Sequence, residues 1–338
     1  MDRAAAVLCT SMNPLPIRAF APGRVNLIGE HTDYNDGLCL PFAVELGVTV
    51  TAELRDGGTV EAPDLEDDDP YLRGALAELR AAGIDPPGST LGVASDLPRE
   101  AGLSSSAALC VALVMALCAT AGAEPAPAPE LARICSRIES DYTGAETGLL
   151  DQLASLLGRE GHAVRLDMRT LEAEQVELDL GDHVLAVLDS GASRSLAESG
   201  YNERREECRR AARLLGVDSL RDATDSSGLP DPLDRRVRHV VTENERVDAA
   251  VAALRSRDPV ALGELLDRSH ASLRDDYEVS VPEVERAVAA CHGAGALGAR
   301  IMGGGFGGSV VALFPPEAEP PRSALRVRPA PGARLLRA

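Results

Sequence analysis

The segment Ala21–Gly37 constrains this chain most, because it crowds polar side chains between three glycines and beside a short apolar run. Its polar members include Arg24, Glu30, His31, Asp33, Tyr34, Asn35 and Asp36. Carboxylate, amide and imidazole groups together suit a ligand with many hydroxyls, since each hydroxyl needs both a donor and an acceptor. An Asx-rich surface turn is the alternative, because Asp, Asn and Gly all favour turns.

The charge and residue usage of the whole chain exclude several classes of protein. With 34 basic and 53 acidic residues, the formal net charge is −19, which disfavours nucleic acid or an anionic membrane as a partner. The chain contains no lysine, so neither a P-loop nor a Schiff-base lysine is available. The seven cysteines include no CxxC pair and the six histidines no HExxH motif, so neither a disulfide framework nor a zinc site is indicated.

The length of 338 residues suggests two domains, and the composition shifts around 172–181. We place the domains at 1–178 and 179–338. The first ten residues are too short and too charged for a signal peptide, and the longest apolar run, 107–121, falls short of a membrane span. We therefore expect a cytoplasmic protein with no membrane partner, present as a monomer or a weak homodimer.

Local hydrophobic patterns predict the secondary structure. A strand pair is expected at 38–54, and single strands at 91–95, 183–190, 310–314 and 324–328. Helices are expected at 72–82, from the serine triplet to about 122, and at 130–142, 149–157, 201–215, 232–253, 260–272 and 282–292.

A second motif, Leu97–Leu109, places a glycine and three serines at the start of a nearly all-apolar helix. One serine would suffice as an N-cap, whereas three supply redundant hydroxyls beside the unpaired amides of the first turn. Those amides and the helix dipole form an anion site, and a hydroxyl there can ligate Mg²⁺. A plain N-cap before a core helix is the alternative.

A third motif, Arg300–Ser309, contains five glycines among six consecutive residues. Such a loop loses much entropy on ordering, which is explained if its backbone must approach a phosphate or another segment closely. A flexible hairpin tip is the alternative.

Two acids complete the set of candidates: Asp151, in the first turn of an apolar helix, and Glu139, late on an amphipathic helix. Each could instead be an ordinary surface acid.

Together these segments resemble the GHMP kinase superfamily and, within it, the galactokinases. The first motif is similar to the galactokinase signature, the serine triplet to the phosphate-binding motif, and the glycine-rich segment to the third motif. Similarity extends through 149–158, 201–216, 235–247 and 269–285, and so covers most of the chain. The resemblance implies an α+β fold of two domains with the active site in the cleft between them.

The resemblance also implies roles for individual residues. Sugar contacts would be Arg24, Glu30, His31, Asp33, Gly148, Asp151 and Tyr201, with Asp151 as the catalytic aspartate and Arg24 beside it. The nucleotide would be held by Gly102, Leu103, Ser104, Ser105 and Ser106 and by Gly304 and Gly305, and Mg²⁺ by Ser106 and Glu139.

The reaction implied is transfer of the γ-phosphoryl group of ATP to the anomeric hydroxyl of a galactose-like sugar. Asp151 would accept or orient the hydroxyl proton, and Arg24 would share the charge of the transferred group. Departures from the family pattern stand at Glu100, at Glu146, at the pair Ser193-Arg194 and at Asp68. Two alternatives remain, an anomeric kinase for a modified or longer sugar and a non-catalytic sugar and ATP sensor.

Overall fold

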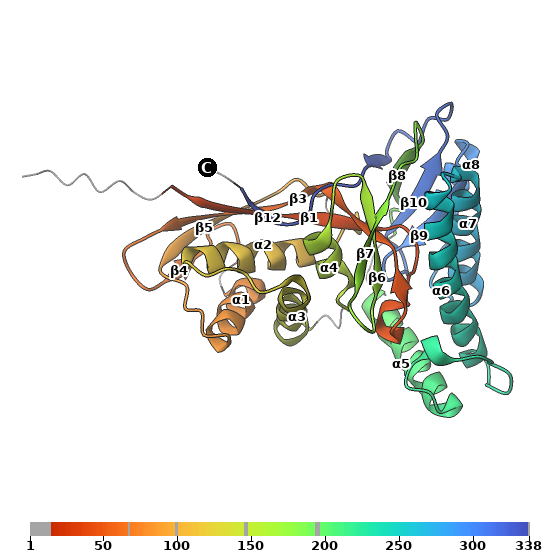
Figure 1. The fold of residues 1–338 in the computed structure, drawn as a ribbon, viewed down its shortest axis with the longest axis horizontal. Coiled ribbons are helices and arrows are strands. Elements are labelled where there is room, and N and C mark those ends of the chain that lie inside the picture. Colours follow the sequence, from red (N-terminus) through yellow and green to blue (C-terminus); the bar gives the residue numbers. More distant parts are fainter. Residues whose placement is uncertain (1–14, 67, 99–100, 145–147, 193–196, 337–338) are drawn as a thin grey trace, which may run out of the picture.

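The computed structural model describes residues 15–336 except 67, 99–100, 145–147 and 193–196. The molecule is elongated, with two regions that follow one another along its long axis (Figure 1). In one region a sheet containing β1, β3 and β5 covers helices α1 to α3, and in the other a sheet containing β8, β9 and β10 packs against α7 and α8. This α+β arrangement is the expected fold class.

In the described part of the chain the strands form three sheets. Their orders are β12-β1-β3-β5-β4, β11-β8-β10-β9 and β2-β6-β7. The bounds are β1 Ile17–Asn26, β2 Leu38–Cys39, β3 Pro41–Leu54, β4 Val60–Glu61, β5 Ser89–Ser95, β6 His162–Asp167, β7 Ala173–Glu177, β8 Val184–Asp189, β9 Gly298–Met302, β10 Ser309–Phe314, β11 Leu325–Val327 and β12 Arg334–Leu336.

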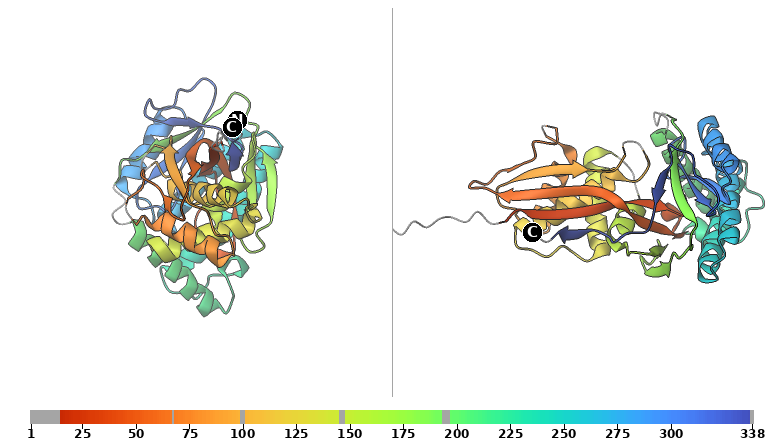
Figure 2. Two further views of the ribbon diagram at one scale, coloured as in Figure 1. Left: turned by 90° about the vertical axis from the view of Figure 1, so that its left-hand side faces the viewer. Right: turned by 90° about the horizontal axis from the view of Figure 1, so that it is seen from above.

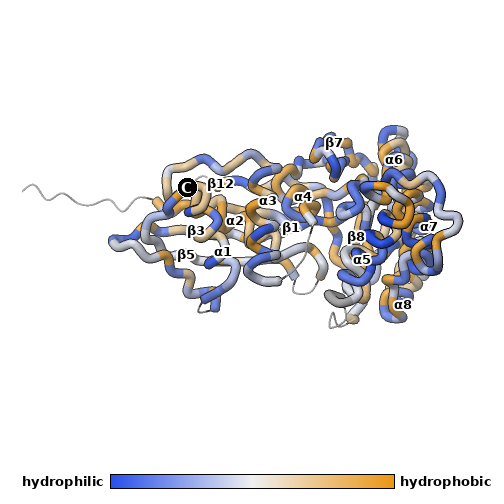
Figure 3. Tube along the Cα trace, turned by 90° about the horizontal axis from the view of Figure 1, so that it is seen from below, coloured by the Kyte–Doolittle hydropathy of each residue, from blue (hydrophilic) through white to orange (hydrophobic). Residues whose placement is uncertain are grey.

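The helices agree with the predicted segments to within a few residues, apart from one helix end described below. They are α1 Pro70–Ala81, α2 Ser105–Thr120, α3 Ala128–Ile138, α4 Leu150–Leu157, α5 Ala197–Leu215, α6 Leu233–Arg255, α7 Pro259–Asp275 and α8 Pro282–Gly293. Short helical turns stand at η1 Asp33–Asn35, η2 Glu139–Thr143 and η4 Leu220–Asp222. The tube of α6 to α8 alternates between hydrophilic and hydrophobic residues, as expected of helices with one buried face (Figure 3).

The strand pair predicted at 38–54 is wrong. β2 pairs with β6, whereas β3 is one long strand between β1 and β5. Gly47 does not turn the chain; it lies inside β3, where an added Cβ would stand 2.3 Å from the carbonyl oxygen of Ala21 on β1. Alternation along a segment shows that it is extended, but it does not show which distant strand becomes its partner.

The helix predicted at 130–142 also needs correction. The α-helix ends at Ile138, and Glu139–Thr143 form one wider π-helical turn. Such turns occur frequently at functional sites, and local sequence preference does not distinguish them from α-helix. Six strands of the described chain were not predicted, namely β1, β4, β6, β7, β9 and β12. The last of them, β12, pairs with β1, so the last described residues of the chain return to the sheet formed by the first (Figure 2).

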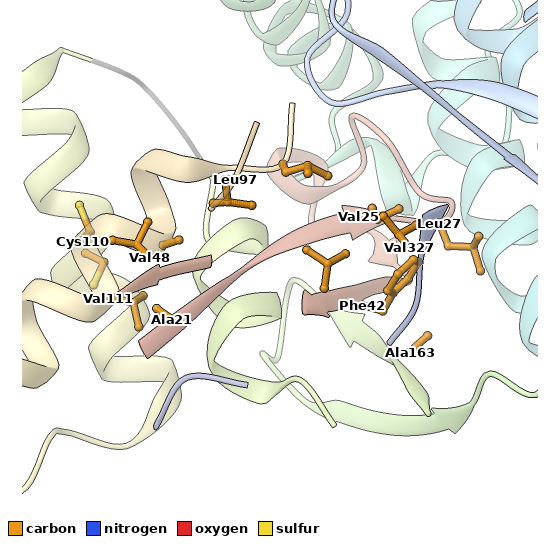
Figure 4. Close-up of a cluster of buried hydrophobic side chains, with 14 of the residues drawn as sticks. Ala21, Val25, Leu27, Phe42, Val48, Leu97, Cys110, Val111, Ala163 and Val327 are labelled. Atoms are coloured by element: carbon orange, nitrogen blue, oxygen red, sulfur yellow. The ribbon is translucent and has the colours of Figure 1, made fainter. Parts of the chain in front are cut away.

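Helix α2 fills the core of the first region. It is apolar on all sides and packs on β1 and β3, which is the pattern expected of a buried helix. Ala21 and Val25 of β1 and Val48 of β3 lie in the same apolar cluster as Cys110 and Val111 of α2 (Figure 4). This packing places the N-terminus of α2, with its serines, at the inner end of the first region.

Helix α7 is pressed directly against β9. Gly298 of β9 and Gly263 of α7 allow the approach, because a Cβ at Gly263 would lie 2.6 Å from the carbonyl oxygen of Leu297. Strand β9 carries Arg300 and leads into the glycine-rich loop, so this contact determines where that loop lies.

We expect Gly263→Ala to lower the free energy of unfolding by about 1–3 kcal/mol, because the new methyl group must push α7 away from β9. Chemical denaturation measures the change. The matched control is Gly293→Ala at the end of α8, where a Cβ meets nothing within 4 Å. That variant should be neutral or slightly more stable. Equal stability of the two variants would contradict the close approach.

Candidate active site

Arg24, near the end of β1, joins the serine-bearing loop to helix α4. Its Nε and Nη2 donate to the two carboxylate oxygens of Asp151 at 2.7 and 2.8 Å, and its Nη1 donates to the carbonyl of Gly102 at 2.7 Å. The Arg24 side chain is 8% exposed, so this bidentate pair is largely shielded from water. Paired hydrogen bonds of this kind hold both planar groups in one orientation.

Ser104 is the N-cap residue of α2 but does not cap the helix with its side chain. It has a left-handed backbone (φ 56°), and its hydroxyl donates instead to Oδ2 of Asp151. The carboxylate of Asp151 therefore accepts hydrogen bonds from both Arg24 and Ser104. Since Asp151 occupies the first turn of α4, the helix dipole also favours its negative charge.

The glycine-rich loop is held to the first motif by Glu30. Its Oε1 accepts a hydrogen bond from the amide of Gly303 at 2.8 Å and lies 2.8 Å from Nη2 of the fully buried Arg300. Nη1 of Arg300 donates to the carbonyls of Asn26 and Leu27. These contacts bring the first and third motifs side by side.

Asp33, Gly148 and Tyr201 come together from three separate segments. A Cβ on Gly148 would stand 2.2 Å from Oδ2 of Asp33, so any other residue there would displace the Asp33 carboxylate. The pKa of Asp33 is raised to about 7, chiefly because burial disfavours the charged form and also because Glu30 and Asp151 are negative. Burial likewise raises the pKa of Tyr201, whose phenol therefore stays neutral.

One cavity of about 580 Å³ collects the predicted residues. Its walls include Arg24, Glu30, His31, Asp33, Gly102, Leu103, Ser104, Ser105, Ser106, Gly148, Asp151, Tyr201, Gly304 and Gly305. All the predicted site residues line it except Glu139. A volume of this size is typical of a small-molecule site.

Glu139 lies in the π-helical turn, behind the cavity wall. It is 2% exposed, and its carboxylate accepts a hydrogen bond from the amide of Gln152, the neighbour of Asp151 on α4. Its charge also helps raise the pKa of Cys110, after burial and Cys135.

The residues that orient the first motif from α6 were not predicted from the sequence. Glu243 accepts hydrogen bonds from the amide of Gly29 (3.0 Å) and from Ser269 (2.7 Å), and His239 contacts the carbonyl of Glu30 at 3.1 Å. Burial alone would raise the pKa of Glu243, but Arg246, His239 and Arg300 lower it to about 2. The sequence offered two weak signals for them: the spacing of four residues that places His239 and Glu243 on one helix face, and their place in the segment 235–247 that resembles the family.

Of the positions at which the chain departs from the family pattern, only Asp68 lies among the described residues. Asp68 is exposed and pairs with Arg73 at 2.7 Å. Glu100, Glu146, Ser193 and Arg194 lie outside the described residues.

Within the described ranges, no group of three or more His, Cys, Asp or Glu side chains could hold a metal ion by itself. No helix there combines the length and the apolar character that crossing a membrane requires.

Comparison with known proteins identifies the family. The galactokinase galactose-binding signature matches residues 11–54, the N-terminal domain of the GHMP kinases matches 70–159, and their C-terminal domain matches 250–331. The galactokinase of Streptomyces coelicolor is 43% identical, with 87% of this chain and 83% of that protein covered. The chain belongs to the galactokinase family.

Further members of the galactokinase family agree in length and in fold. The galactokinase of Thermotoga neapolitana is also 43% identical, over 88% of this chain and 89% of its own. The crystal structure of Lactococcus lactis galactokinase complexed with galactose is similar, with 32% identity, a TM-score of 0.87 and 96% of each chain covered. A mevalonate kinase with 18% identity and a TM-score of 0.64 shares the fold.

The raised pKa of Asp33 predicts a pH-dependent effect of Asp33→Asn. Folding raises this pKa from 3.8 to about 7, so the ionised side chain costs stability, and the cost grows as the pH rises until it levels off above the folded value. Asparagine carries no such cost. The free energy of unfolding of the variant, relative to the parent protein, should therefore rise by about 1–3 kcal/mol from about pH 5 to about pH 8.

Denaturation of both proteins at the two pH values measures this difference. The control is Asp85→Asn, since Asp85 has an 82% exposed side chain that pairs only on the surface. Its effect should be the same at both values. A difference for Asp33→Asn that is flat or falls with pH would contradict the raised pKa.

Proposed function

We propose that the protein transfers the γ-phosphoryl group of ATP to the anomeric hydroxyl of galactose, giving galactose 1-phosphate and ADP. The observation that carries the proposal is the arrangement around Asp151. The carboxylate of Asp151 accepts hydrogen bonds from Arg24 and Ser104 and faces the cavity. The first motif and the N-terminus of α2 both line that cavity. Membership of the galactokinase family supports the same reaction.

The sugar would lie against the part of the cavity formed by Glu30, His31, Asp33, Gly148 and Tyr201. Carboxylate oxygens there can accept hydrogen bonds from sugar hydroxyls, and the imidazole and phenol can supply the complementary groups. The relative from Lactococcus lactis was crystallised with galactose, and the chain is similar to it over nearly its full length.

The nucleotide would lie at the N-terminus of α2 and along the glycine-rich loop. The first turn of the helix opens on the cavity with free amides and two serine hydroxyls. The loop fits a phosphate chain because it lacks side chains: a Cβ on Gly304 would already lie 3.1 Å from the ring of Tyr201.

The oxygen ligands available also fit Mg²⁺. Mg²⁺ prefers hard oxygen donors and in kinases is held by one or two protein groups together with substrate phosphates. The hydroxyl of Ser106 in the cavity wall and the carboxylate of Glu139 behind it would be those groups. The bound cation would neutralise charge on the phosphates.

In the proposed reaction Asp151 orients the anomeric hydroxyl and accepts its proton as the new bond to phosphorus forms. Arg24 and Ser104 keep the carboxylate in position through their hydrogen bonds. The chain has no lysine, and among the described residues that line the cavity positive charge near the transferred group is supplied by Arg24 and by the amides at the start of α2.

We expect Asp151→Asn to lower kcat about 10²–10⁴-fold and to change sugar affinity much less, because the amide preserves shape but cannot accept the proton. Coupled ADP release measures kcat, and calorimetry with galactose measures binding. Asp85→Asn is again the control and should retain full turnover. Turnover near that of the parent protein in Asp151→Asn would refute the assigned role.

A panel of acceptors tests the sugar itself. Galactose should give the highest kcat/KM among galactose, 2-amino-2-deoxygalactose, arabinose, longer sugars and glucose, which differs from galactose only at C4. ADP release with each acceptor, and with none, is the measurement. A better rate with a modified or longer sugar would assign the enzyme to that substrate, and binding without any release would favour a sensor.

A further inference from the structure

His31 stands in the cavity wall in an unusual conformation. Its backbone lies in the left-handed region (φ 60°), which is costly for a residue other than glycine, and its carbonyl accepts a hydrogen bond from Asn35 at 2.9 Å. The residue is 3% exposed. Its ring nitrogen Nε2 is buried without a hydrogen-bond partner among the described residues, and the residue lines the cavity. A buried polar atom of this kind calls for a partner that the protein itself does not supply.

The other ring nitrogen is anchored by a chain of hydroxyl and thiol groups. Nδ1 lies 2.8 Å from Oη of Tyr34, which lies 3.0 Å from Oη of Tyr277. Sγ of Cys208 lies 2.9 Å from the same Oη of Tyr277. Tyr277 and Cys208 are buried, so this chain extends from the cavity wall into the core of the second region.

The chemistry of these groups sets the direction of the hydrogen bonds. Burial lowers the pKa of His31, so the ring is neutral and carries one proton. A phenol is a stronger donor than a neutral imidazole N–H, and an imidazole nitrogen is a stronger acceptor than a phenol oxygen. When Tyr277 donates to Tyr34 and Tyr34 donates to Nδ1, the ring proton of His31 is on Nε2.

The surroundings favour the same tautomer. The neighbouring groups in the cavity wall include the carboxylates of Glu30, Asp33 and Asp151, which in their ionised form only accept hydrogen bonds. A sugar hydroxyl that donates to one of them has an oxygen lone pair left to satisfy. A donor at Nε2 of His31 complements that lone pair.

We propose that Tyr34 is a positioning residue for sugar recognition: its hydroxyl, held by Tyr277, donates to Nδ1 of His31 and so presents Nε2–H to a galactose hydroxyl. The inference rests on the proposed function for the identity of the sugar. The tautomer itself is a property of the protein alone.

The first test is the tautomer of His31 in the free protein. Long-range ¹H–¹⁵N correlation spectra distinguish a protonated Nε2 from a protonated Nδ1, and the signal of His31 is identified by its loss in His31→Gln. We expect one tautomer, protonated at Nε2, in the parent protein and a mixture in Tyr34→Phe. Protonation of Nδ1 in the parent protein would overturn the proposal. This measurement needs neither ATP nor sugar, so it stands even if the proposed reaction fails.

The second test separates positioning from general loss of structure. Tyr34→Phe should raise the KM for galactose about 3- to 10-fold and leave kcat within about 2-fold, as expected for one weakened hydrogen bond. Tyr277→Phe keeps the bond between Tyr34 and Nδ1, so its effect should be smaller. The matched control is Tyr142→Phe, whose ring packs on Gly74 of α1 and which should leave KM unchanged.

Deoxy sugars then identify the hydroxyl concerned. Among monodeoxygalactoses that each lack one hydroxyl other than the anomeric one, a single analogue should bind the parent protein and Tyr34→Phe equally well. Every other analogue should retain the difference between the two proteins. If all analogues retain it, or if the control raises KM as much as Tyr34→Phe, the proposal is wrong.

Discussion

Arg300 carries a full positive charge into the interior, and the site depends on how that charge is matched. A buried guanidinium is costly unless it is paired and hydrogen-bonded. The partners of Arg300 are Glu30 and the carbonyls of Asn26 and Leu27, all in the first motif. Arg300 itself belongs to β9 in the second region. The ion pair between Arg300 and Glu30 joins the first motif to β9. The Gly303 amide bonds to the same Glu30 oxygen.

The same principle operates on the other side of the cavity. Arg24 reaches Asp151 and Gly102 together, so strand β1, helix α4 and the serine-bearing loop meet at one guanidinium. Gln152, next along α4, donates to Glu139 while Asp151 faces the cavity. One turn of α4 thus positions both carboxylates that the proposed chemistry uses. Neutral groups complete the wall, since burial keeps the ring of His31 and the phenol of Tyr201 uncharged.

Much of this site could be predicted from the sequence because its residues are unusual where they stand. Three features indicate a ligand rather than packing. They are the run of glycines between two apolar segments, the three serines where one would cap a helix, and the acids beside an apolar run. The partners supplied by α6 could not be predicted. Glu243 and His239 look like any polar residues of an amphipathic helix, and only the contacts with Gly29 and Glu30 give them a role.

By itself the sequence determined the helices and some of the strands, because hydrophobic period is a local property. The α+β class and most of the residues expected to line the cavity followed from the resemblance of the motifs to the galactokinases. Only the tertiary structure decided that β3 pairs with β1 rather than with its neighbour, that β12 returns to the first sheet, and that Ser104 bonds to Asp151 instead of capping α2. Those outcomes depend on which distant groups are brought within a few ångströms, and pairing between segments far apart in the chain leaves no periodic trace in either of them.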